Sequence, residues 1–132
     1  AAAEQRWADA AGDLRRALAA WETVYGPEHP RLVEPLTWLC AVDSARGEHA
    51  AAKTACNRAV ALASRARDQA QSALAHFALA KAEVAAAAAR GDAGPEARVL
   101  ALNLARQALD EASAAGETAL ASAISAWIAG QG

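Results

Sequence analysis

Residues 25–30 of this chain read Tyr-Gly-Pro-Glu-His-Pro, the most proline-dense part of a sequence otherwise rich in helix-forming residues. Two prolines and a glycine within five positions interrupt a helix, because proline lacks an amide hydrogen and clashes with the preceding turn. Pro30 stands where the first turn of a new helix would begin, a position that tolerates the missing N–H. The stretch therefore predicts a corner between two helices, which His29 is expected to brace by capping backbone groups.

Helical patterns lie on both sides of this corner and continue along the chain. Apolar residues recur at spacings of three and four, glycine or proline separates the segments, and no alternating strand pattern stands out. The helices are expected at residues 3–24, 31–46, 48–66, 69–90, 95–115 and 117–129. Because the connections are short, successive helices should run antiparallel. We predict an all-α fold of about six helices arranged as antiparallel helical hairpins.

Composition limits the classes of partner. The 132 residues suffice for one domain with a core, and the formal net charge is −2. This charge argues against a phosphate-binding surface, so nucleic acid is not expected as a partner.

No apolar run approaches the roughly 20 residues that span a bilayer, and no signal peptide is visible. We expect a cytoplasmic protein without membrane association and, since the sequence lacks methionine, a piece of a longer polypeptide.

The chain contains an internal repeat, which is typical of stacked helical hairpins. A shift of 42 residues places Ala10, Ala17 and Leu18 on Ala52, Ala59 and Val60. A further comparison places Leu36, Leu39 and Cys40 on Leu74, Phe77 and Ala78. A single hairpin cannot bury both of its faces, so neighbouring hairpins should stack.

The central unit resembles a tetratricopeptide repeat (TPR). The residues that carry the resemblance are Leu36, Leu39, Cys40, Gly47, Ala52 and Ala59. The Gly-Pro-Glu-His-Pro corner is similar to that of the kinesin-light-chain-like subclass. The resemblance implies a right-handed α-solenoid formed by one domain, residues 1–132. Its parts would be the second helix of a partial repeat (3–25), a complete repeat (31–66), a complete repeat with a long first helix (69–115) and a C-terminal capping helix (117–129).

Residues 77–116, together with the final helix, resemble the C-terminal repeat region of bacterial serine/threonine protein kinases. This second resemblance implies a regulatory or sensory role, although the chain has no glycine-rich loop, HRD or DFG motif. The favoured hypothesis is a non-catalytic protein–protein interaction or scaffold module without a cofactor. A regulatory region of a kinase and an effector-binding domain of a transcriptional regulator are the alternatives.

In TPR proteins the first helix of each pair lines a concave surface that receives peptides or partner helices, so the resemblance implies such a surface here. Its expected residues are Glu34, Thr37, Trp38, Ala41, Ser44, Ser72, Ala75, His76, Leu79 and Glu83. Trp38 is the expected anchor, because an aromatic side chain beside small polar residues is typical of an interface. Packing of Trp38 against the preceding helix is the alternative. The face with Trp7, Leu14 and Trp21 is expected to be uncovered and open to self-association.

Few residues are candidates for chemistry. Cys40 and Cys56 lie on the two helices of one hairpin, with His49 at its mouth. Packing as small buried apolar residues is the favoured interpretation of the cysteines, and a zinc site and a redox pair are the alternatives. Three charged residues of these helices are expected to be solvated and to need no further role: Asp43, Lys81 and Glu83. No metal or cofactor is expected.

Overall fold

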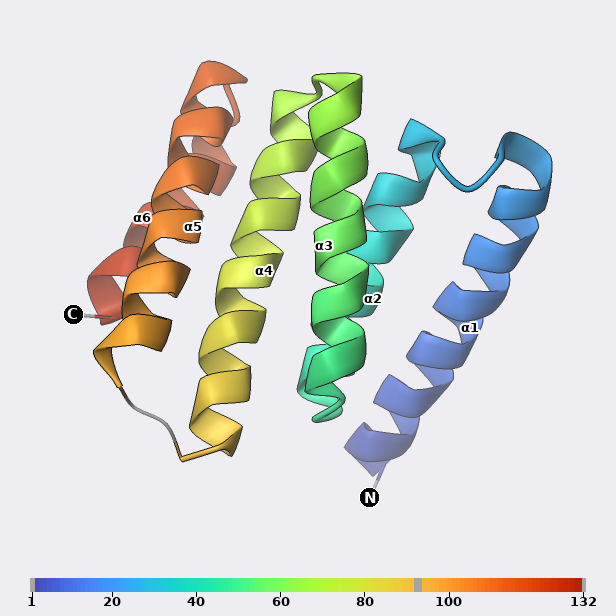
Figure 1. Ribbon diagram of the computed structural model, residues 1–132, viewed down its shortest axis with the longest axis horizontal. Helices are drawn as coiled ribbons and strands as arrows, with labels where there is room; N and C mark the ends of the chain where they lie inside the picture. Colours follow the sequence, from blue (N-terminus) through green and yellow to red (C-terminus); the bar gives the residue numbers. More distant parts are fainter. Residues whose placement is uncertain (1, 92–93, 132) are drawn as a thin grey trace.

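The computed structural model describes residues 2–91 and 94–131, and these residues form helices without any strand (Figure 1). The α-helices are α1 (Ala2–Tyr25), α2 (Val33–Ala45), α3 (His49–Ala66), α4 (Gln69–Ala89), α5 (Pro95–Ala114) and α6 (Thr118–Gln131). One turn of 3-10 helix, η1 (Pro30–Leu32), precedes α2. The prediction of an all-α fold is confirmed for this part of the chain. Within it, no helix has both the length and the apolar character needed to cross a membrane.

Successive helices run in opposite directions and lie side by side (Figure 1). Helices α2 and α3 pack as one antiparallel pair, and α4 and α5 pack as a second. The two pairs meet through contacts of α4 with both α2 and α3. At the two ends of the row, α1 packs on α2, and α6 packs on α5, behind which it lies in Figure 1. Helix α4 therefore has neighbours on several sides, and this position decides which of its residues reach the surface.

The corner predicted at residues 25–30 is present, and side chains hold it in place. Gly26 follows α1 with a φ of +89°, a conformation that residues with a side chain rarely adopt. His29 Nδ1 accepts a hydrogen bond from the backbone amide of Arg31 at 3.1 Å and so caps η1. From α3, Arg58 Nη2 donates to the carbonyl oxygen of Pro27 at 2.7 Å. The capping role of His29 is confirmed, and Arg58 fastens the corner to the central hairpin.

The helix predicted over residues 31–46 begins differently in the structure. Its first residues belong to η1, and α2 begins only at Val33. Pro35 lies in the first turn of α2, where its missing amide hydrogen leaves no hydrogen bond unmade within that helix. The other helices begin and end within two residues of the bounds expected from sequence.

Small side chains supply much of the core between the helices. Ala52, Ala59 and Ala63 are fully buried in the cluster that joins α1, α2, α3 and α4. Because an alanine methyl group buries little apolar area, each of these contacts stabilises the fold less than a leucine contact would. We therefore expect covalent and ionic links between helices to contribute much of the stability.

A second cluster joins α4, α5 and α6. Ile124 of α6 is fully buried in this cluster, and Ile128 packs against it. The rings of Phe77 and Trp127 meet edge to face, with their centroids 5.8 Å apart. Helix α6 therefore covers apolar residues of both helices of the second pair.

Asp43 is buried, so the prediction that it is solvated was wrong. Its side chain has no exposed surface, and its carboxylate accepts hydrogen bonds from Arg15 Nη2 at 2.7 Å and Arg46 Nη1 at 3.2 Å. Arg46 follows the last residue of α2, whereas Arg15 comes from α1, which sequence spacing alone does not place beside α2. The two guanidinium groups balance the buried charge, and Arg15 ties α1 to α2.

Candidate partner-binding surface

Helix α2 has one exposed face. Trp38 is 57% exposed, Glu34 and Ala41 are exposed with it, and Ser44 is half-buried. Spacings of four and three residues place Glu34, Trp38 and Ala41 in one row along the helix. An indole with more than half of its surface exposed is available to a partner.

The other half of the expected surface lies inside the protein. Five expected residues are buried, so the prediction that they are exposed was wrong: Thr37, Ser72, Ala75, His76 and Leu79. The last four lie on α4, which is packed against α2, α3 and α5. Leu74, which the repeat comparison aligns with Leu36, is exposed, whereas Leu36 is buried. The prediction failed because it assumed that one whole face of α4 is free.

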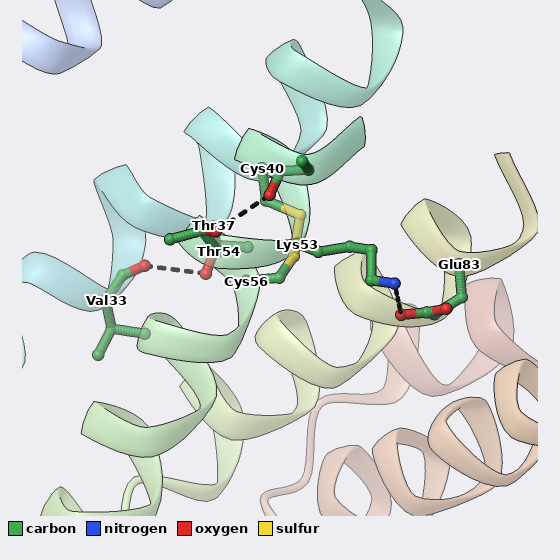
Figure 2. Close-up of a disulfide and its surroundings, with 8 residues drawn as sticks. Val33, Thr37, Cys40, Lys53, Thr54, Cys56 and Glu83 are labelled. Atoms are coloured by element: carbon green, nitrogen blue, oxygen red, sulfur yellow. Dashed lines mark hydrogen bonds and ion pairs between the residues drawn. A yellow bond between two sulfur atoms is a disulfide. The ribbon is translucent and has the colours of Figure 1, made fainter. Parts of the chain in front are cut away.

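Glu83 is the remaining expected residue, and it contacts Lys53 of α3 (Figure 2). Glu83 Oε1 lies 3.2 Å from Lys53 Nζ, and only 12% of the glutamate side chain is exposed. This ion pair links α3 to α4 and leaves little of Glu83 exposed, so the predictions that it is solvated and available to a partner were wrong. Of the ten expected residues, the structure brings four together on an accessible face, and all four belong to α2.

Two of the buried residues belong to a polar network between α4 and α5. The Ser72 hydroxyl donates to Glu111 Oε2 at 2.5 Å, and His76 Nδ1 lies 2.7 Å from Glu111 Oε1. Ser72 Oγ also lies 3.3 Å from the same ring nitrogen. In a Ser-His-acid triad the serine and the carboxylate contact opposite ring nitrogens, whereas here both contact Nδ1. The geometry therefore differs from a triad, and the network satisfies buried polar groups while joining the two helices.

Glu111→Ala is expected to lower the free energy of unfolding by about 1–3 kcal/mol, because it removes the acceptor of the buried Ser72 and His76 side chains. Urea denaturation followed by circular dichroism measures the change. Asp110→Ala is the matched control: Asp110 is exposed on the same turn, so its loss should change the free energy by less than about 0.5 kcal/mol. Equal effects of the two substitutions would contradict a stabilising network.

A disulfide bond joins Cys40 of α2 to Cys56 of α3 (Figure 2). The two Cα atoms are 5.3 Å apart, and neither residue is exposed. The interpretation of the cysteines as unlinked packing residues was right about burial and wrong about bonding. Spacing placed them on one hairpin but did not show that their Cβ atoms face each other. Because each sulfur is bonded to the other, neither is free as a thiolate ligand for zinc.

Several apolar side chains of α1 are left exposed. These are Trp7, Trp21, Val24 and Tyr25. Ala11 and Leu18 are buried in the core cluster, and Leu14 packs against the same cluster. The expected uncovered face is therefore present at Trp7 and Trp21, whereas Leu14 contributes to the core.

No protein-family model matches this chain, and comparisons with curated proteins and with solved structures gave no match either.

Proposed function

We propose that this chain is a non-catalytic protein–protein interaction module of the TPR kind, which binds a peptide or a partner helix through the exposed face of α2. The observation that carries the proposal is the exposure of Trp38 on a helix whose opposite side is buried. Tryptophan is enriched among the residues that dominate binding energy at interfaces. A tryptophan side chain has only two rotatable bonds, so it provides a large contact area at a low cost in conformational entropy.

The packing around α2 supports this role. The disulfide fixes α2 to α3, and the Arg15–Asp43 ion pair fixes it to α1, so the row formed by Glu34, Trp38 and Ala41 is held on a rigid element. A pre-organised surface binds more tightly than a mobile one, because less ordering is required. The side-by-side packing of the pairs α2–α3 and α4–α5 supports the proposal of stacked helical hairpins. We propose that these hairpins form a right-handed solenoid, with α6 as its capping helix.

Trp38→Ala is expected to weaken binding of a partner polypeptide by about 30-fold or more, the effect of removing a central aromatic anchor. Because Trp38 is exposed, the same substitution should change the free energy of unfolding by less than about 1 kcal/mol. A photo-crosslinking residue at position 41 captures the partner, and titration of the captured polypeptide with each variant measures the affinity.

Trp7→Ala is the matched control for this experiment, since Trp7 is also exposed but lies on α1. It should leave the affinity unchanged. Unchanged binding by Trp38→Ala would overturn the proposal. Loss of helical structure in Trp38→Ala would show that the indole supports the fold rather than a partner.

Two further expectations belong to this proposal. Self-association through Trp7 and Trp21 of α1 is proposed as a second, weaker contact, because exposed aromatic patches commonly mark association sites.

The cytoplasmic location expected from the sequence is in tension with the Cys40–Cys56 bond, since stable disulfides are uncommon in reducing compartments. The disulfide favours an oxidising environment or a bond that forms only part of the time.

A further inference from the structure

Helices α4, α5 and α6 surround a pocket at the end of the molecule opposite to α1. Its volume is about 310 Å³. The wall is apolar and consists of Val84, Ala87, Ala88, Ala97, Ala101 and Leu102. Three helices contribute to the lining, and Figure 1 shows the C-terminal end of α6 beside the beginning of α5. The pocket is separate from the exposed face of α2, so an inference about it does not depend on the proposed function.

The pocket exists because small side chains line the place where the helices diverge. Ala87 and Ala101 are buried at its wall, and a methyl group at each position leaves space that a leucine would fill. Its volume lies at the lower end of the range of about 300–1,000 Å³ found for small-molecule sites. The pocket therefore has room for a short apolar chain or a single aromatic ring.

Positive charge stands at the edge of this apolar wall. Arg98 lines the pocket, is exposed, and has no hydrogen-bond or ion-pair partner within residues 2–91 and 94–131. Helix α5 begins at Pro95, one turn before Arg98, and the exposed carboxylate of Glu96 in this first turn offsets the positive end of the helix dipole. The guanidinium group of Arg98 at the edge of an apolar pocket favours an anion with an apolar body.

We propose that this pocket binds a small apolar carboxylate. The hydrocarbon part lies against the alanine, valine and leucine side chains, and the carboxylate pairs with Arg98 at the edge. Gln131 of α6 also lines the pocket and donates its amide to the Trp127 carbonyl at 3.3 Å, so α6 closes one side of the site. Neither a metal nor a covalent step is involved.

Octanoate and octanol are the probes, because they share an apolar chain and differ in charge. Amide chemical shifts of the whole chain are followed by NMR during titration with each probe. We expect octanoate to bind at least about tenfold more tightly than octanol, with shifts that cluster around the pocket. Octanol binding as tightly as octanoate, or no octanoate binding at millimolar concentration, would overturn the proposal.

Two substitutions test separately how the charge of Arg98 and the volume of the pocket contribute to binding. Arg98→Gln is expected to weaken octanoate binding about tenfold and to leave octanol binding unchanged, because only the carboxylate pairs with the guanidinium. Ala88→Leu fills the pocket and should weaken the binding of both probes. Arg106→Gln is the matched control: Arg106 is exposed further along α5, outside the pocket, and its loss should change neither affinity.

The charge test does not depend on how Ala88→Leu folds, because Arg98→Gln alters only an exposed side chain. Equal octanoate affinities of wild type and Arg98→Gln would show that the arginine does not recognise the ligand and would refute the site. Trp38→Ala should bind octanoate like the wild type, which keeps this result distinct from the outcome of the partner-binding experiment.

Discussion

Reduction of the Cys40–Cys56 disulfide is expected to lower the free energy of unfolding by about 3 kcal/mol. The bond links positions 16 residues apart, and opening it returns the conformational freedom of that loop to the unfolded chain. In a chain of this size the loss corresponds to a fall in Tm of about 10 °C. Thermal unfolding followed by circular dichroism, with and without dithiothreitol, measures the change.

The controls for this experiment follow from the burial of both cysteines. A reductant reaches the bond only when α2 and α3 separate, so the chain is reduced in denaturant and then refolded with dithiothreitol present. The variant C40A/C56A should unfold near the temperature of the reduced wild type, and dithiothreitol should not affect it. If the oxidised and reduced wild-type chains unfold at the same temperature, the bond does not stabilise this fold.

The disulfide matters for the proposed function as well as for stability. It is the covalent link between α2, which carries Trp38, and α3. Because small alanine side chains supply much of the packing around it, reduction should loosen this hairpin more than it would loosen a leucine-rich one. A partner that requires a rigid α2 face would then bind the oxidised chain more tightly than the reduced chain.

Removal of both cations around Asp43, in the variant R15M/R46M, is expected to lower the free energy of unfolding by about 3–5 kcal/mol. Methionine keeps much of the apolar stem of arginine but leaves a carboxylate with no exposed surface and without a cation. Asp43→Asn should cost less, about 1–3 kcal/mol, because Arg15 and Arg46 are partly exposed and remain hydrated when the charge is lost. Urea denaturation of the variants gives the order of these effects.

A third variant tests whether the unpaired buried carboxylate causes the destabilisation of R15M/R46M. R15M/R46M/D43L replaces the whole ionic group with apolar side chains, so it should recover most of the stability that R15M/R46M loses. Arg16→Met is the control for loss of a surface arginine, since Arg16 pairs with exposed Asp13, and it should change the free energy by less than about 0.5 kcal/mol. If Asp43→Asn lowers the free energy of unfolding more than R15M/R46M does, the buried charge without a cation is not the main cause of the destabilisation.

Some of the candidate site was predictable from local sequence and some was not. The row of Glu34, Trp38 and Ala41 follows from helical spacing, and the structure places these residues together. Ser72 and His76 are four residues apart, so spacing puts them on one face of α4, but nothing in the sequence pointed to Glu111 as their partner. Whether that face meets solvent or α5 depends on how the two helix pairs pack.

The sequence by itself determined the helices, their approximate ends and the corner at residues 25–30, because periodicity, proline and capping act within a few residues of one another. Only the tertiary structure decided that Cys40 bonds to Cys56, that Asp43 is buried between Arg15 and Arg46, and that most of α4 is covered. These outcomes depend on which helix faces lie against each other. In an alanine-rich chain several faces of a helix are small enough to pack closely, so local pattern alone does not select among them.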